Sequence, residues 1–201
     1  MKKLFILTFL ACGLALSAQA QNTVRVGDSY GGGMAYDKGT NILNVGIGLG
    51  RTVRSYNFVG WGYSGIGASL NASYDIGIHE YFSVGPYAGI GRYNVVFGWN
   101  MTAIAFGVRG SFHYVALANE ALDLGLNEDK LDLYVTLGLG GEYISANIDD
   151  DDFFGDSFGG VGFDFGTLIG GRYLFNERFG VFTELGYGAL SVWTIGLTVN
   201  M

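Results

Sequence analysis

The sequence predicts an all-β protein, an eight-stranded antiparallel up-and-down transmembrane β-barrel. Three observations support this prediction. Eight segments show an alternation of apolar and polar residues with a period of two, which is the pattern of strands with one apolar face. Charged residues make up 14% of the chain, against roughly 25% in soluble domains. No run of about eighteen apolar residues follows residue 20, so the apolar content indicates membrane strands and not membrane helices.

The first twenty residues have the parts of an export signal. Lys2 and Lys3 precede an apolar stretch from Leu4 to Leu10, and Ala18-Gln19-Ala20 is a small-x-small cleavage site. A retained membrane helix is disfavoured because the apolar stretch is short. A lipoprotein signal ending at Cys12 is the other alternative, and the residues before Cys12 fit a lipobox poorly.

The sequence therefore predicts three segments: a signal peptide over 1–20, a periplasmic N-terminal segment over 21–40 and the barrel over 41–201. Cleavage removes Cys12, the one cysteine, and leaves a chain without disulfides. Residues 21–40 either plug the barrel, pair as an extra strand or hang free.

The charge excludes nucleic acid as a partner. Without Lys2 and Lys3, nine basic residues (11 − 2) face 18 acidic ones, a net charge of −9 (9 − 18). Nucleic-acid-binding domains carry a basic patch or stripe instead.

The cleanest strand pattern runs from Gly65 to Ile78, where apolar residues occupy every second position. Its other face carries glycine, serine, asparagine and one aspartate, which suits a narrow interior better than a watered surface. The eight expected strands are Asn41–Val53, Gly65–Ile78, Phe82–Tyr93, Thr102–Tyr114, Leu131–Tyr143, Val161–Phe175, Phe179–Tyr187 and Val192–Met201.

The connections predict which end lies outside the cell. An even strand number places both chain ends on the periplasmic side. The tight connections at His79–Tyr81 and Asn176–Arg178 are expected there, and the longer polar ones, Arg54–Ser64 and Ala146–Gly160, outside. Val115–Lys130 is long for a periplasmic turn, and Gly188–Ser191 is short for an outer loop.

Aromatic residues on the lipid-facing positions are expected to gather in two interfacial belts. Pro86 is the one misfit, because a proline in mid-strand removes a ladder hydrogen bond unless a bulge absorbs the change. The expected belt residues are Phe82, Phe112, Tyr114, Tyr173, Phe175 and Phe179 at the periplasmic end, and Phe163, Phe165, Tyr187 and Trp193 at the outer end.

Large side chains are expected to fill the interior, which in an eight-stranded barrel is just wide enough for them. Buried charges must be paired, and the Asn176–Arg178 turn puts Arg172 opposite Glu184 or one step from it. We therefore expect a structural ion pair between Arg172 and Glu184. The expected inward residues are Tyr87, Arg109, His113, Tyr134, Leu168, Arg172, Leu174 and Phe182.

Two further carboxylates, Glu142 and Asp164, are expected to point inward near the outer end. Two close carboxylates act as a general acid/base pair or bind a cation. The interpretation we favour is that Arg109 or another donor balances them.

The predicted outer loop Ala146–Gly160 contains a run of acidic residues. Their carboxylate oxygens are hard ligands that could bind calcium or a divalent ion that bridges to lipopolysaccharide. It lacks EF-hand spacing, and an acidic run is more often a solvated loop tip. Arg51 and Arg92 are expected on the outer face at the rim, in reach of anionic lipid headgroups. The acidic residues are Asp149, Asp150, Asp151, Asp152 and Asp156.

Neither histidine is placed for catalysis at the outer mouth. His79 falls in a periplasmic turn, and His113 near a periplasmic strand end within reach of Asp132. We expect Asp132 to fix the tautomer of a structural His113, and we expect no catalytic residue, metal or cofactor.

Several stretches resemble the small outer-membrane β-barrel domain family of exported, porin-like bacterial proteins. The resemblance implies an eight-stranded barrel that the outer-membrane insertion machinery assembles, in a family whose members mostly lack a defined activity. The family's own Gly-Pro step matches Pro86, while its usual terminal phenylalanine is Met201 here. The stretches are DKGTNILNVGIGLG from Asp37, FSVGPYAGIG from Phe82, VRGSFHY from Val108, KLDLYVTLGLG from Lys130 and GGRYLFNERFGVFTELGYG from Gly170.

The function expected from these observations is that of a non-catalytic outer-membrane barrel, a monomer, that serves envelope structure or surface interaction through its loops. Its expected partners are outer-membrane lipid, lipopolysaccharide, the barrel-assembly machinery and an unidentified surface partner. The alternatives are a narrow channel for ions or small solutes and a soluble periplasmic barrel with an apolar ligand.

Overall fold

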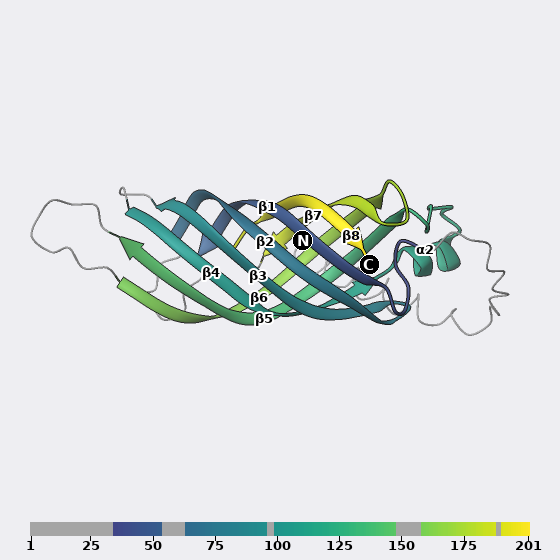
Figure 1. Ribbon diagram of the computed structural model, residues 1–201, viewed down its shortest axis with the longest axis horizontal. Helices are drawn as coiled ribbons and strands as arrows, with labels where there is room; N and C mark the ends of the chain where they lie inside the picture. The colour runs from purple at the N-terminus through teal and green to yellow at the C-terminus, as the bar shows by residue number, and fades with distance from the viewer. Residues whose placement is uncertain (1–33, 54–62, 96–98, 148–157, 188–189) are drawn as a thin grey trace, which may run out of the picture.

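The computed structural model describes residues 34–53, 63–95, 99–147, 158–187 and 190–201. Eight strands form one closed barrel in sequence order, and β1 pairs with β8 to close it (Figure 1). This confirms the predicted fold class. The elements are β1 (Asn41–Val53), β2 (Tyr63–His79), β3 (Phe82–Val95), β4 (Trp99–His113), α2 (Val115–Leu122), β5 (Leu131–Asn147), β6 (Phe158–Leu174), β7 (Phe179–Tyr187) and β8 (Trp193–Asn200).

The start of β1, the end of β8, α2 and the turns after β2 and β6 all lie at one end of the barrel, here called the α2 end (Figure 1). The opposite end is called the far end. At the far end five strands begin or end two to four residues beyond the predicted bounds, at Tyr63, Val95, Trp99, Asn147 and Phe158. The backbone ladder satisfies N–H and C=O groups whatever the side chains, so pairing continues past the apolar pattern that located the strands.

Helix α2 was not predicted and fills the first half of the long connection between β4 and β5. Its sequence VALANEAL consists mainly of good helix formers. The helix ends at Asp123, whose left-handed backbone (φ 50°) lets its N–H donate to the carbonyl of Asn119. The Asn119 side chain then bonds to both backbone groups of Leu126, N–H and C=O, and so folds the rest of the connection back on the helix.

Pro86 is accommodated without a bulge. The β2–β3 register is the same on both sides of it, with Ser73 opposite Tyr87 and Ile76 opposite Val84, and the two pairs between them are missing from the ladder. Gly85 allows this close approach, since a Cβ there would lie 1.7 Å from the Tyr74 carbonyl oxygen.

The outer face is an apolar belt. Val108 is 63% exposed and Phe163 is 71% exposed, as lipid-facing residues of a membrane barrel are. Aromatic rings pair within the belt at the α2 end, where the Phe82 and Phe112 ring centroids lie 5.2 Å apart. Thr183 also lies on this outer face, and its hydroxyl group accepts a hydrogen bond from Trp193 Nε1 at 2.8 Å.

An arginine placed in the middle of this belt tests whether the belt faces the membrane. We expect Val108→Arg, in the middle of β4, to lower the free energy of unfolding in lipid vesicles by about 2–4 kcal/mol. The matched control is Val161→Arg, on a 75% exposed residue of β6 near the far end, where the loss should be about 0–1 kcal/mol. Equal losses at both positions would contradict a membrane-facing belt.

Candidate functional site

The interior holds a chain of acidic and basic side chains that alternate along it and end on a histidine. Its members come from five strands, β2, β4, β5, β6 and β7, and each contacts the next one by a hydrogen bond or ion pair. All are at most 6% exposed. In order, they are Glu184, Arg109, Asp75, Arg172, Asp132 and His113.

Arg109 is the centre of the first half of this chain. Its Nε and Nη2 donate to the two carboxylate oxygens of Asp75 at 2.8 and 2.7 Å, a bidentate contact. Its Nη1 donates to Glu184 Oε1 at 2.8 Å, which also accepts from the Tyr134 hydroxyl at 2.9 Å. Asn44 adds a donor to Asp75 at 3.2 Å, so Asp75 is bound from both β1 and β4.

Arg172 carries the second half of the chain, and it corrects one prediction. Arg172 bonds to Asp75 through Nη2 and to Asp132 through Nη1 at 2.7 Å, while Glu184 bonds to Arg109 instead. The register explains the difference: Arg172 lies directly opposite Asp132 on β5, whereas on β7 it faces Phe182, and Glu184 faces Gly170. The expected Arg172–Glu184 pair is therefore wrong, although its register was right to within one step.

His113 ends the chain at the α2 end of the barrel. Its Nδ1 lies 2.9 Å from Asp132 Oδ1, as predicted, and its Nε2 lies 2.9 Å from Ser83 Oγ. The ring of Tyr36 stacks on the imidazole with centroids 3.4 Å apart and planes 6° apart. Ser83 and Tyr36 were not predicted as site residues.

Residues 34–40 cover this end of the barrel, which answers part of the question left open for residues 21–40. Ala35 and Tyr36 are buried. The Tyr36 hydroxyl donates to the His79 carbonyl at 3.0 Å, and the Ala35 N–H donates to the Glu128 carbonyl at 2.8 Å. Burial raises the pKa of the Tyr36 hydroxyl well above its usual value, with the nearby Asp132 charge adding to the effect, so Tyr36 stays neutral.

Ser83, His113 and Asp132 have the order of contacts found in a serine hydrolase relay. A nucleophile must meet its substrate, and here Ser83 is 1% exposed and Tyr36 covers His113. Asp132 is also shared with Arg172. The arrangement therefore fits a structural polar cluster better than a catalytic one.

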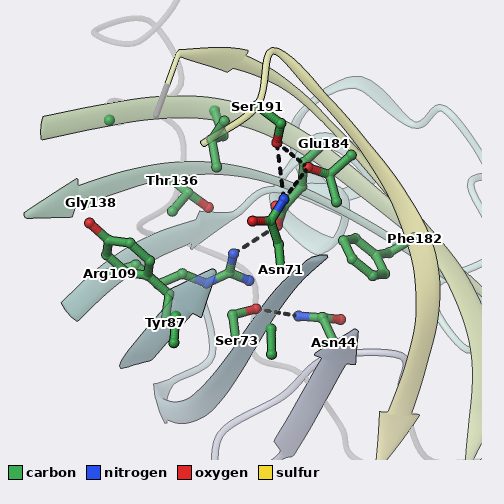
Figure 2. A pocket seen from close by; sticks show the side chains of 15 residues that line it. Asn44, Asn71, Ser73, Tyr87, Arg109, Thr136, Gly138, Phe182, Glu184 and Ser191 are labelled. Atoms are coloured by element: carbon green, nitrogen blue, oxygen red, sulfur yellow. Dashed lines mark hydrogen bonds and ion pairs between the residues drawn. The ribbon is translucent and has the colours of Figure 1, made fainter. Parts of the chain in front are cut away.

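A small cavity of about 40 Å³ lies beside Arg109 and Glu184 (Figure 2). At roughly 10–15 Å³ per molecule it has room for about three waters. On its wall, Asn71 donates to Ser191 Oγ at 3.1 Å, and Asn44 donates to Ser73 Oγ at 3.2 Å. Its other lining residues with polar side-chain groups are Tyr87, Thr136 and Thr194.

A cluster of buried apolar side chains lies inside the barrel toward the far end. Leu190 lies inside the barrel, 5% exposed, with a left-handed backbone (φ 85°) that is unusual for leucine. The Tyr93 hydroxyl donates to its carbonyl. The cluster consists of Tyr87, Tyr93, Met101, Ala103, Ala105 and Leu190.

Glu142 and Asp164 lie diagonally across the β5–β6 ladder, since Asp164 faces Gly140 and Glu142 faces Gly162. Asp164 accepts from the Tyr87 hydroxyl at 2.8 Å. Arg109 does not balance them, because it lies nearer the α2 end and bonds to Asp75 and Glu184.

Of the predicted rim residues, Arg92 lies exposed on the outer face of β3. Arg51 belongs to β1, and its side chain is outside the described part. The acidic residues 149–152 and 156 and the signal residues 1–20 also lie outside the described residues. Within the described ranges, no group of three or more His, Cys, Asp or Glu side chains is placed to hold a metal ion, and no helix is long and apolar enough to span a membrane.

No protein-family model and no curated protein matches the chain, but solved structures do. The crystal structure of Ail, the attachment invasion locus protein of Yersinia pestis, matches 82% of this chain and 99% of its own, with 14% identity and a TM-score of 0.50. OprG from Pseudomonas aeruginosa matches 83% and 97%, with 10% identity and a TM-score of 0.48. Neisserial surface protein A matches 82% and 96%, with 10% identity and a TM-score of 0.45. The chain thus has the fold of an outer-membrane β-barrel.

A double-mutant cycle tests the observed pairing. We expect Arg109→Met and Glu184→Gln to be coupled by about 1–3 kcal/mol in the free energy of unfolding, because the two groups share a buried contact. The matched cycle with Arg172→Met and Glu184→Gln should give a smaller coupling, since that pair belongs to the same network but no bond joins the two groups. Unfolding in urea with vesicle-inserted protein measures both cycles, and the reverse ranking would contradict the chain described above.

Proposed function

We propose that this protein is an integral outer-membrane barrel without catalytic activity, which serves envelope structure or surface interaction through its far-end loops. The observation that carries the proposal is the occupied interior. A buried charge chain crosses the barrel, an apolar cluster with Leu190 lies toward the far end, and residues 34–40 cover the α2 end. A barrel filled in this way leaves its outer rim and loops as the surfaces for partners.

Outer-membrane placement is supported by the fold, by the apolar belt and by the export signal that the sequence predicts. A soluble barrel with an apolar ligand would need the opposite orientation, with its apolar face inward. We propose outer-membrane lipid and lipopolysaccharide as partners of the belt and of exposed Arg92. We also propose assembly by the barrel-insertion machinery, a monomeric state and an unidentified partner at the loops.

Planar-bilayer recording tests the closed interior. We expect no stable open level from the purified protein at high salt, because the Arg109–Asp75–Arg172 contacts cross the lumen and isolated ions cannot replace them cheaply. A general porin recorded in the same bilayers is the positive control. A stable, reproducible conductance step would support the narrow-channel alternative and contradict this proposal.

A loop exchange tests where the function lies. In a strain that lacks the gene, we expect the wild-type gene to restore both survival in detergent and attachment of cells to surfaces. A variant with residues 54–62 replaced by a short Gly/Ser/Asn turn should restore survival alone, because the barrel is intact and one loop is lost. The same exchange at residues 148–157 is the matched control for loop identity. Full attachment with both loop variants would argue against a surface role.

A further inference from the structure

The buried charge chain carries a net negative charge if His113 is neutral. Asp75, Asp132 and Glu184 contribute three negative charges, and Arg109 and Arg172 contribute two positive ones, a balance of −1 (2 − 3). An unbalanced charge in a buried cluster is costly. A positive charge on His113, which contacts the terminal Asp132, would give three of each sign and continue the alternation.

Both ring nitrogens of His113 face oxygen atoms. Nδ1 lies 2.9 Å from a carboxylate oxygen of Asp132, and Nε2 lies 2.9 Å from the hydroxyl oxygen of Ser83. A doubly protonated imidazolium donates through both nitrogens, whereas neutral imidazole donates through one only. The Ser83 hydroxyl can accept from the imidazolium, so the contacts suit the charged form.

The stack on Tyr36 points the same way. Two neutral aromatic rings avoid a full face-to-face sandwich because their negative faces repel. The Tyr36 and His113 centroids are 3.4 Å apart with nearly parallel planes, which is that sandwich. A cation over the face of a tyrosine ring is instead attracted to it.

Tyr36 is the buried anchor of residues 34–40. Among the described residues, three backbone bonds also hold this segment in place: the Ala35 N–H donates to the Glu128 carbonyl, the Gly39 N–H to the Gly77 carbonyl and the Gly77 N–H to the Thr40 carbonyl, each at 2.8 Å. Segments with few contacts open locally at low free-energy cost. Weakening the stack therefore shifts the whole segment toward release.

We propose that residues 34–40 form a proton-dependent cap, held on the α2 end of the barrel by an imidazolium at His113 and released when His113 loses its proton. At low pH His113 is charged, the chain is balanced and Tyr36 stacks on a cation. As pH rises, His113 becomes neutral, its bond to Asp132 changes from an ion pair to a neutral-donor hydrogen bond, and the stack becomes a repulsive sandwich. The cap then opens the polar interior to water at this end.

Charged and polar groups from four other strands also face His113. Arg172 and Asp132 face it from β6 and β5, Asp75 from β2, and the neutral Ser83 and Tyr134 from β3 and β5. Burial keeps the Tyr36 hydroxyl protonated through its raised pKa. His113 is the group whose ordinary titration falls near neutral pH.

Cysteine accessibility of the full chain tests the cap. In a Cys12→Ser background, Ala35→Cys places a thiol in the buried part of the segment and Lys38→Cys places one in its exposed part. The ratio of their maleimide labelling rates cancels the pH dependence of the reagent. We expect this ratio to rise about tenfold from about pH 5 to about pH 9, the size of effect that one desolvated cation–π contact supports.

Matched variants distinguish release of the cap through His113 from a general destabilisation of the barrel. His113→Gln, which cannot be charged, should make the ratio independent of pH, and Tyr36→Leu should leave Ala35→Cys accessible at every pH. Tyr36→Phe keeps the ring and should keep the pH dependence. Heat-modifiable gel mobility confirms that each variant is a folded barrel.

Two results would overturn the proposal. One is a wild-type ratio that stays constant over the range, or the same rise in His113→Gln. The other is an NMR titration in which the His113 ring stays neutral throughout while the cap remains docked.

Discussion

The requirement that buried charges be paired governs the inside of this barrel. Asp75, with 1% of its surface exposed, would be prohibitively costly alone, and it is bound by two arginines from β4 and β6. Each of those arginines then needs a further anion, which Glu184 and Asp132 supply. The contacts join strands on opposite sides of the lumen, so the pairing that satisfies the charges also fills the cross-section. The closed interior proposed above rests on this chain.

The two ends of the barrel follow from the same constraint. Bulk solvent would screen the contacts of the charge chain, and a different group of residues lies over the chain toward each end of the barrel. Toward the far end it is an apolar cluster with Leu190 held in a left-handed backbone by Tyr93. At the α2 end it is a segment from outside the barrel, which meets the chain at its terminal residue. The second cover depends on a titratable group, and the first does not.

Sequence reasoning found the strands well because period-two alternation is a property of one strand at a time. It placed β1 and β7 at their observed bounds and assigned Arg109, Arg172 and Glu184 to the interior. It could not assign partners across the lumen, since register relates neighbouring strands only and Arg172 reaches Asp75 on a strand four positions away. Asp75 was the one charged residue on the inner face of its predicted strand, and this was the only sequence feature that indicated it as a buried partner for the arginines. Tyr36 carried none, because nothing in a short irregular segment predicts where its ring docks.

The cluster of Ser83, His113 and Asp132 shows why contacts alone do not define chemistry. In a hydrolase the aspartate orients a neutral imidazole that accepts a proton from an exposed serine. Here the aspartate already neutralises Arg172, the serine is buried, and the charge count favours a protonated ring that donates to the serine. The direction of the Ser83–His113 hydrogen bond is then reversed. The same distances describe an ion pair that fastens a cap, and the surrounding charges decide between the two.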